Sequence, residues 1–202
     1  MAILSANDLI YGYTNGIFPM ADEENQLYWY SPDPRAIIPI DTYKPPKSLR
    51  PIINSNKFEI KINTDFEGVM RGCSLARTEQ DSTWISEEII SAYTDLHFLG
   101  YAHSVEAYFD KQLVGGLYGV AIGTAFFGES MFYTMSNASK VAFHFLIERL
   151  KQQKYELLDT QFINDNVLRY GAIEIPKSDY IGLLRKAISR RASFVEKNES
   201  YI

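Results

Sequence analysis

Three consecutive β-strand patterns near the middle of the chain constrain its fold more than any other feature of the sequence. Each segment is rich in apolar, aromatic and β-branched residues, and only two residues separate one segment from the next. The strands are expected at 103–109, 112–122 and 125–133, joined by Asp110-Lys111 and Gly123-Thr124. Two-residue gaps of this kind are typical of tight β-hairpins. The pattern therefore predicts an antiparallel meander, against which the rest of the chain must pack.

The segments on either side of this meander predict helices and additional strands. Residues 137–152 carry polar side chains at helical spacing, which indicates an amphipathic helix. Residues 157–162 follow as a strand, so we expect them to pair in parallel with the meander through a right-handed crossover. Further helices are expected from Ser86 to Gly100 and from near Ser178, and another strand at 58–62. This order describes an α+β protein with a mixed sheet flanked by helices.

Prolines divide the chain near its N-terminus. Ser5 and Asp8 fit the capping box of a short first helix, and six prolines lie between residues 32 and 51. Because proline lacks a backbone donor and restricts the chain, neither a regular helix nor a central strand is expected within 32–51. We therefore predict a small N-terminal domain at residues 1–35 and a larger domain at residues 36–202.

Composition excludes several classes of protein. Cys73 is the single cysteine, so an intrachain disulfide and a thiolate metal cluster are excluded, and the three histidines lie far apart in sequence. A metal site is therefore not expected. No apolar run reaches membrane-spanning length, and the N-terminus lacks a basic segment followed by an apolar stretch. These features predict a cytoplasmic protein without a membrane partner.

Two clusters of cations stand out against a formal net charge of −5. The first contains Lys44, Lys47, Arg50, Lys57 and Lys61. The second contains Lys177, Arg185, Lys186, Arg190, Arg191 and Lys197. The negative total argues against a protein that coats nucleic acid, including DNA, without specificity. Either cluster by itself is more simply interpreted as a solvated surface, although a local contact with RNA phosphates is compatible with both.

Two segments carry polar residues suited to chemistry. Asp159 and Gln161 are two apart on an expected strand, so their side chains project from the same face. Glu129 stands within the almost wholly apolar string 126–132, where an unpaired carboxylate is costly. Spacing alone favours the plainer interpretation that these acids pair with buried Arg or Lys or cap backbone groups. If they open together into an apolar pocket, the same three groups are what acyl transfer to an amine requires.

Nine short strings of the sequence, taken in order, resemble the leucyl/phenylalanyl-tRNA–protein transferase family. They are GIFPM at 16–20, WYSPDPR at 29–35, TWI at 83–85, GYAHSVE at 100–106, LVGGLYGV at 113–120, FGESMF at 127–132, NASK at 137–140, LDTQ at 158–161 and GAIEIP at 171–176. The strings run from residue 16 to residue 176, which is most of the chain. An ordered set of this length is far more specific than any one motif.

The resemblance implies both a fold and a reaction. The fold is a small N-terminal domain, abbreviated here relative to the family, and a catalytic domain related to the acetyltransferase-like (GNAT) fold. In the reaction, leucine or phenylalanine, and more weakly methionine, passes from the 3′ end of a charged tRNA to the α-amine of a protein that begins with Arg or Lys. That protein is thereby marked for degradation. No metal, nucleotide or other cofactor is implied.

The resemblance also implies roles for particular residues. By motif position, Asp159 and Gln161 resemble the catalytic pair of the family, and Glu129 its third polar residue. We expect Asp159 to polarise or deprotonate the attacking amine, Gln161 to orient it, and Glu129 to hold a cationic group. The residues that resemble the substrate pocket, and that are equally typical of a core, are Met20, Trp84, Leu117, Phe126, Phe143 and Leu146. The cations expected to contact tRNA are Lys44, Lys47 and Arg50.

Departures from the family pattern concern acceptor choice and tRNA docking more than the chemistry. They are Tyr30, Asn166, Arg169 and Tyr170. Two alternative functions remain. A GNAT-like acyltransferase that uses acyl-CoA needs a glycine-rich turn at a helix start for the pyrophosphate, whereas Gly115, Gly116 and Gly119 lie in a strand pattern. A noncatalytic adaptor for tRNA or protein N-termini is the other, and the intact acid and amide positions argue against it.

Overall fold

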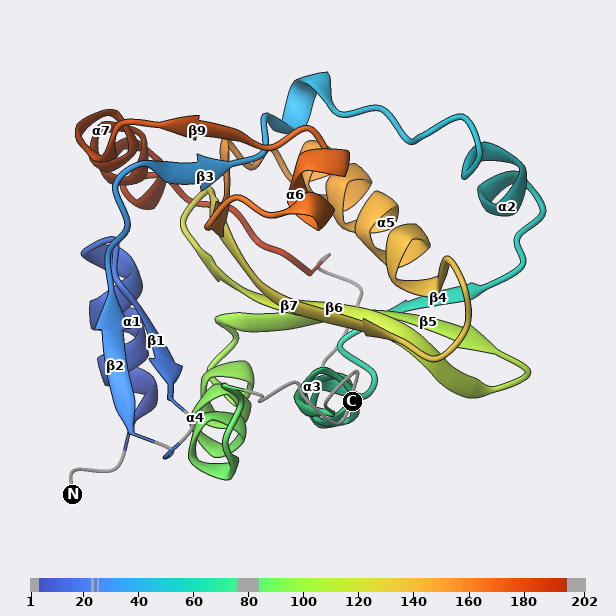
Figure 1. The fold of residues 1–202 in the computed structure, drawn as a ribbon, viewed down its shortest axis with the longest axis horizontal. Coiled ribbons are helices and arrows are strands. Elements are labelled where there is room, and N and C mark those ends of the chain that lie inside the picture. The colour runs from blue at the N-terminus through green and yellow to red at the C-terminus, as the bar shows by residue number, and fades with distance from the viewer. Residues whose placement is uncertain (1–3, 23, 25, 76–83, 196–202) are drawn as a thin grey trace.

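The computed structural model describes residues 4–22, 24, 26–75 and 84–195 (Figure 1). Its centre is a mixed sheet with the strand order β4-β5-β6-β7-β8-β3-β9. These strands are β3 Arg35–Ile37, β4 Glu59–Ile62, β5 Ala102–Phe109, β6 Gln112–Ile122, β7 Ala125–Tyr133, β8 Leu157–Gln161 and β9 Ile173–Ile175. A separate antiparallel pair, β1 Phe18–Ala21 and β2 Leu27–Tyr30, lies to one side of the main sheet.

The expected meander is confirmed as β5, β6 and β7. Each of these strands pairs antiparallel with the next. The first turn has the left-handed backbone of a tight hairpin, with φ of 49° at Asp110 and 65° at Lys111. Helix α5, Ala138–Gln152, then leads to β8, which pairs in parallel with β7. The predicted parallel pairing is therefore confirmed, because the helix carries the chain back along the sheet.

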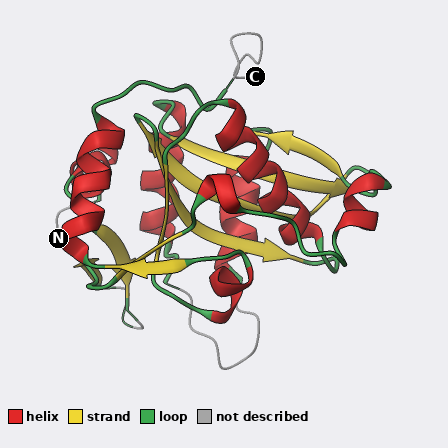
Figure 2. Cartoon of the chain, turned by 90° about the horizontal axis from the view of Figure 1, so that it is seen from above, coloured by secondary structure: helices red, strands yellow, loops and turns green. Residues whose placement is uncertain are grey.

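Helices cover both faces of the main sheet (Figures 1 and 2). Helix α5 packs on one face, and α3 Phe66–Ser74 and α4 Glu87–Phe98 pack on the other. Neighbouring residues of β6 alternate accordingly, since Leu117 belongs to the core beneath α5 and Tyr118 to the core beneath α3 and α4. None of the helices in the described part of the chain combines the length and the apolar character needed to cross a bilayer.

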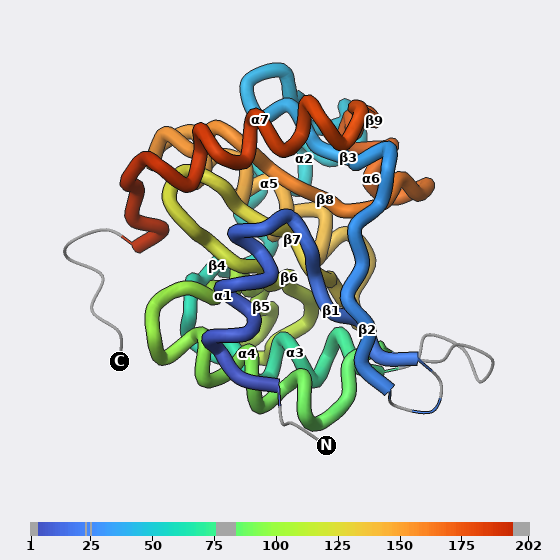
Figure 3. Tube along the Cα trace, turned by 90° about the vertical axis from the view of Figure 1, so that its left-hand side faces the viewer, coloured from blue at the N-terminus to red at the C-terminus, as the bar shows by residue number. Residues whose placement is uncertain are grey.

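Segments from the two ends of the chain lie side by side (Figure 3). Helix α1, Ala6–Thr14, begins after Ser5, which forms the predicted capping box with Asp8. This helix contacts α4 and also α7, Lys177–Ile188. Helices α4 and α7 confirm the helices predicted after Ser86 and near Ser178. The α+β class is thereby confirmed, with the N-terminal and C-terminal segments packed together beside the sheet.

The proline-rich stretch is more regular than the sequence predicts. Strand β3 lies within it and pairs with both β8 and β9, so the expectation of no central strand was wrong there. The physical reason is that no proline lies between Pro34 and Pro39, which leaves the donors of β3 intact. Helix α2, Arg50–Asn54, accepts Pro51 because the first turn of a helix does not need that donor. The domain division at residue 35 stays a prediction, and this residue is the first of β3.

The elements that the sequence did not predict are all short. They are β1, β2, β3, β9, α2, α3, α6 Asp165–Arg169 and the 3₁₀ helix η1 Ile40–Thr42. The longest of them, α3, has nine residues, and β3 has three. Segments of this length contain too few periods for a hydrophobic pattern to distinguish helix from strand.

Candidate active site

A cavity of about 330 Å³ lies between β7 and β8, where the two strands stop pairing. The last pair of the ladder is Phe127 with Asp159, although β7 continues to Tyr133. The apolar side of the cavity adjoins α5 and is lined by Leu117, Met131, Phe143, Leu146, Leu158 and Val167. Its polar lining consists of Glu129, Ser130, Thr160, Gln161, Asn164 and Asn166. One hollow therefore joins an apolar wall to a carboxylate and several amides.

Glu129 reaches the cavity because it is the extra residue of a β-bulge. Tyr118 pairs with Ser130 and Gly119 pairs with Gly128, so no residue of β6 pairs with Glu129. A bulge of this kind bends the strand and changes the direction of a side chain. The carboxylate that looked misplaced in an apolar string is thus turned out of the ladder and toward the cavity.

Three polar side chains surround the Glu129 carboxylate. Its Oε1 accepts hydrogen bonds from the Tyr13 hydroxyl at 2.7 Å and from the Gln161 amide nitrogen at 2.8 Å. The Tyr93 hydroxyl lies 3.5 Å from Oε2 and is hydrogen bonded to the Tyr13 hydroxyl. Burial raises the pKa of Glu129 to about 7, although the hydrogen bonds from Tyr13 and Gln161 oppose that rise. A carboxyl group with this pKa can take up and release a proton at neutral pH.

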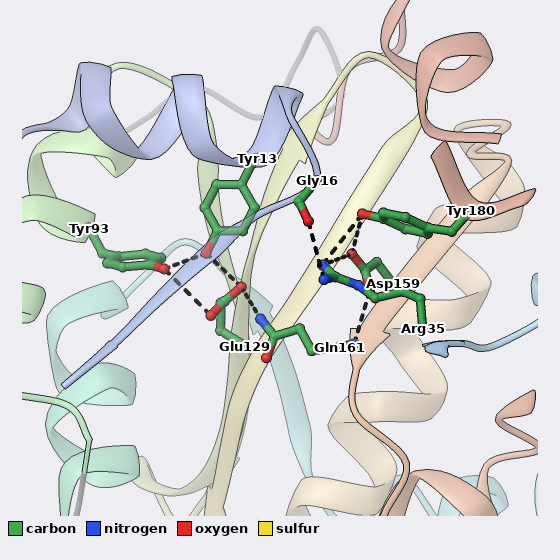
Figure 4. A network of polar contacts seen from close by, with 8 residues as sticks. All are labelled: Tyr13, Gly16, Arg35, Tyr93, Glu129, Asp159, Gln161 and Tyr180. Atoms are coloured by element: carbon green, nitrogen blue, oxygen red, sulfur yellow. Dashed lines mark hydrogen bonds and ion pairs between the residues drawn. The ribbon is translucent and has the colours of Figure 1, made fainter. Parts of the chain in front are cut away.

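Gln161 stands in a strained backbone conformation beside Glu129. Its φ is 67°, a left-handed value that residues with a side chain rarely adopt. The N–H of Phe162 donates to the carbonyl oxygen of Thr160 at 2.8 Å, which closes a γ-turn around Gln161. Strain of this kind persists only where the surroundings hold it, and it is concentrated at functional sites. The turn directs the amide of Gln161 toward Glu129 rather than along the strand (Figure 4).

Asp159 lies behind this pair and does not line the cavity (Figure 4). Its completely buried carboxylate forms a forked ion pair with Arg35, with Nε 2.9 Å from Oδ1 and Nη2 2.7 Å from Oδ2. Oδ2 also accepts the Tyr180 hydroxyl at 2.6 Å, and Oδ1 accepts the backbone N–H of Gln161 at 2.8 Å. Burial acts to lower the pKa of Arg35, but the Asp159 carboxylate outweighs it and raises that pKa. The guanidinium therefore stays charged.

Most residues that the sequence predicts for the site do line the cavity. They are Glu129, Gln161, Met20, Trp84, Leu117, Phe143 and Leu146. Phe126 does not line the cavity, and lies on β7 before the two strands separate. Its ring fills the core and stacks on Phe194, with 5.3 Å between the ring centroids. The predicted pocket role of Phe126 is therefore not supported by its position.

The two acids differ in a way that spacing could not reveal. Asp159 fits the plainer interpretation of the sequence, a carboxylate paired with a buried arginine. Glu129 does not, because no ion pair among the described residues includes it. The sequence also gave no role to Tyr13, Tyr93 and Tyr180. Arg35 had one available signal, since it is a charged residue followed directly by three apolar ones.

The cations expected to contact tRNA lie elsewhere on the molecule. Lys44, Lys47 and Arg50 are exposed around the segment between η1 and α2, and none lines the cavity. Their role stays a prediction. Lys197 of the second basic cluster lies outside the described residues. A search of the described residues finds no group of three His, Cys, Asp or Glu side chains that could hold a metal ion.

The fold and the site together are compatible with an acyltransferase. A hollow between two separating strands, apolar on one side and bearing a carboxylate and an amide on the other, suits transfer of an apolar acyl group to an amine. Residues 37–185 match the family described as leucyl/phenylalanyl-tRNA protein transferase, and residues 2–33 match the N-terminal domain of that family. The chain belongs to the leucyl/phenylalanyl-tRNA protein transferase family, and it is an aminoacyltransferase.

Individual relatives agree with this assignment along nearly the whole chain. The leucyl/phenylalanyl-tRNA–protein transferase of Herpetosiphon aurantiacus is 50% identical over 192 residues, which cover 95% of this chain and 98% of the relative. That of Chlorobaculum tepidum is 47% identical over 194 residues, covering 96% and 100%. Among solved structures, L-PGS from Bacillus licheniformis shows only a distant likeness, with a TM-score of 0.48 and 12% identity over 92% of this chain and 71% of that one.

Proposed function

We propose that this enzyme transfers leucine or phenylalanine from aminoacyl-tRNA to the α-amine of proteins that begin with Arg or Lys, and so marks them for degradation. The observation that carries the proposal is the cavity, in which the apolar wall beside α5 adjoins the Glu129 and Gln161 pair. The wall suits the side chain of the aminoacyl group. The polar pair suits the ester and the attacking amine. The names of the relatives supply the class of donor and acceptor.

The reaction balances without a cofactor. The unprotonated acceptor nitrogen attacks the ester carbonyl carbon, and a new carbon–nitrogen bond forms as the carbonyl electrons move to oxygen. The nitrogen then loses one proton, the bond to the ribose oxygen breaks, and that oxygen takes a proton as it leaves. An α-amine has a pKa near ~7.7–8.0, so a useful fraction of the acceptor is unprotonated at neutral pH. The protein must therefore align the two substrates and carry one proton between them.

Glu129 is the group we propose for carrying that proton. It lines the cavity, it has a pKa of about 7, and its Oε1 already holds the Gln161 amide. Gln161 orients the amine or the ester through its remaining amide atoms. The sequence predicts Asp159 for the proton and Glu129 for a cation. The burial of Asp159 and its four hydrogen bonds support a role behind Gln161 instead.

Selection of the aminoacyl group rests on an apolar wall. Leu117, Phe143 and Leu146 offer shape and desolvation, with no hydrogen bond to read the end of a side chain. A wall of this kind distinguishes side chains that differ by one methylene by only ~1–3 kcal/mol. We therefore propose leaky selection, with methionine as a weak substrate. Complete rejection of methionyl-tRNA would count against an apolar wall as the selecting element.

The site of action follows from the substrates. Charged tRNA and newly made proteins meet in the cytoplasm, where we propose that the enzyme works. Its nucleic-acid partner is the tRNA of the donor, and the acidic total charge gives no reason to add DNA.

One assay tests donor, acceptor and activity together. The purified chain is incubated with labelled leucyl-tRNA and peptides that begin with Arg, Lys, Asp or Glu, and a parallel reaction offers acetyl-CoA as donor. We expect label only on the Arg and Lys peptides and no acetylation. Transfer from acetyl-CoA would point to the other acyltransferase class. Binding of tRNA without any transfer would point to an adaptor.

A further inference from the structure

Arg35 connects three parts of the chain in the interior of the molecule. Its guanidinium carbon lies between two aromatic rings, 4.7 Å from the centroid of Phe18 and 4.6 Å from that of Tyr180. Nη1 donates to the carbonyl oxygen of Gly16 at 3.3 Å, in the connection between α1 and β1. Arg35 is 1% exposed and does not line the cavity. Burying a charge is costly unless it is paired, and the Asp159 carboxylate supplies the partner of Arg35.

The bonds of Arg35 continue through Asp159 to the backbone of Gln161. Asp159 Oδ1 accepts from Arg35 Nε at 2.9 Å and from the N–H of Gln161 at 2.8 Å. Gln161 is the centre of the γ-turn, with its φ of 67°. Its side-chain nitrogen then donates to Glu129 at 2.8 Å. Arg35, Asp159, Gln161 and Glu129 are therefore joined by a continuous chain of hydrogen bonds. It runs from the guanidinium beside Phe18 and Tyr180 to the cavity, and Gln161 is its strained member.

We propose that Arg35 is a positioning residue of the transfer reaction, acting through Asp159 to hold the Gln161 turn so that its amide meets Glu129. The inference rests on the proposed function of Glu129 and Gln161. It also gives Phe18 and Tyr180 a part in the reaction, since their rings hold the guanidinium although neither touches the cavity. Segments near both ends of the chain are then needed to shape the site.

Lysine cannot replace arginine in this position. The pair uses two nitrogens of one planar group, Nε and Nη2, against the two oxygens of Asp159. An ammonium group offers a compact charge that cannot match this fork or lie flat between two rings. Arg35→Lys therefore keeps the charge while loosening Asp159. This variant therefore tests the positioning of Asp159 separately from the positive charge of residue 35.

The first experiment measures steady-state kinetics of full-length Arg35→Lys with leucyl-tRNA and a peptide that begins with Arg. We expect kcat to fall about 10- to 100-fold, since small misplacements of catalytic groups cost rates of this order. The KM for leucyl-tRNA should stay within about threefold, because the apolar wall of the cavity is untouched. Arg71→Lys is the matched control, since Arg71 forms its ion pairs with Glu67 and Glu87 at the surface. It should leave both constants unchanged.

A double-mutant cycle separates positioning from general support of the fold. In a Gln161→Ala background, Arg35→Lys should lower kcat by less than about threefold, because the amide that Arg35 positions is absent. A merely structural arginine would produce the same loss in both backgrounds, and that result would overturn the inference. Wild-type kcat in Arg35→Lys would overturn it as well.

The failure of the inference is distinguishable from that of the proposed function. If Gln161→Ala and Glu129→Gln retain wild-type turnover, the proposed function of the site fails whatever Arg35 does. If those variants are impaired and the cycle is additive, only the positioning role fails. Thermal unfolding of each variant fixes an assay temperature at which it is folded. Should Arg35→Lys be insoluble, Asp159→Asn keeps the size of the side chain and replaces it in the cycle, with the same expected non-additivity.

Discussion

Asp159 and Glu129 are acids on neighbouring strands, and the protein treats them in opposite ways. Asp159 belongs to the part of β8 that still pairs with β7, and it is sealed against Arg35 and Tyr180. Glu129 belongs to the bulged part of β7 beyond that pairing, where hydroxyl and amide groups surround it and where it forms no ion pair with another described residue. The first region holds its acid in a buried ion pair. In the second region, Glu129 can gain or lose a proton and so change its charge.

The difference shows how one protein can use one acid to position side chains and another to transfer a proton. A carboxylate in a forked pair with arginine is held in one position, because both of its oxygens are bonded to the planar guanidinium. A carboxylate that burial brings to a pKa of about 7 gains or loses its proton at little cost near neutral pH. We therefore expect Asp159 to govern geometry and Glu129 to govern chemistry.

The largest effect is expected for turnover in Glu129→Gln. The substitution keeps the size and an acceptor oxygen for Tyr13 but removes the proton-accepting charge. We expect kcat to fall about 10²- to 10⁴-fold, the usual contribution of general acid–base catalysis. Single-turnover assays with preloaded leucyl-tRNA measure this loss without interference from product release. Turnover near the wild-type rate would contradict the comparison and would favour Asp159 as the group that accepts the proton from the amine.

The second effect concerns stability and is expected for Asp159→Ala. Removing one partner of a buried pair leaves Arg35 charged and unpaired, which costs roughly 3–5 kcal/mol. Urea unfolding should show that loss, and Asp159→Asn, which retains an acceptor oxygen, should lose less. Glu129→Gln serves as the contrast and should lose little, since Glu129 forms no ion pair with the residues that the structure describes. Equal losses at the two positions would show that both acids are structural.

A third test compares the stability of wild type and Glu129→Gln as pH changes. The folded-state pKa of Glu129, about 7, lies above the ordinary value of 4.5, so the folded protein binds this proton more tightly than the unfolded chain does. The stability contributed by this group is thus present at low pH and is lost as pH rises through 7. Relative to Glu129→Gln, the free energy of unfolding of wild type should fall between about pH 4.5 and 7. A flat difference would place the pKa of Glu129 near its ordinary value.

A fourth test moves the pKa of Glu129 without removing the acid. The Tyr13 hydroxyl opposes the rise in that pKa, so Tyr13→Phe should raise it further. Gln161, Asp159 and Arg35 continue to act on it, and the Tyr93 hydroxyl stays 3.5 Å from Oε2. A hydrogen bond to a charged group is worth about 1.5–3 kcal/mol, which corresponds to about one to two pH units. The acidic limb of kcat/KM should therefore move up by about that amount. An unmoved limb would assign it to the acceptor amine.

The smallest effect on chemistry is expected from surface charge. Reversing Lys44, Lys47 and Arg50 together should raise the KM for leucyl-tRNA and leave kcat unchanged, because these exposed residues do not line the cavity. If each contacts one phosphate of a single strand, the logarithmic salt dependence should weaken by about 2, at roughly 0.7 per phosphate. A fall in kcat with unchanged KM would show that this surface is not a docking surface for tRNA.

Several features of the protein were determined by sequence alone. Two-residue gaps specified the meander, and helical spacing after Asn137 specified α5 and hence the parallel return to β8. Glu129 and Gln161 were found because an acid in an apolar string and a polar pair on a strand are unusual. The ordered strings identified the family. The turn, helix and strand signals are local, and local patterns follow the short-range geometry of the backbone.

Other features were decided only by the tertiary structure. Whether Asp159 or Glu129 faces the cavity depends on where β7 and β8 separate and on a one-residue bulge, and strand alternation cannot locate either one. Arg35 and Asp159 are 124 residues apart, and Tyr13 is 116 residues from Glu129. Contacts of this range form when distant segments pack, because the partner that makes a buried charge tolerable need not be near it in sequence. The physical chemistry of each acid was therefore set by neighbours that only the folded chain supplies.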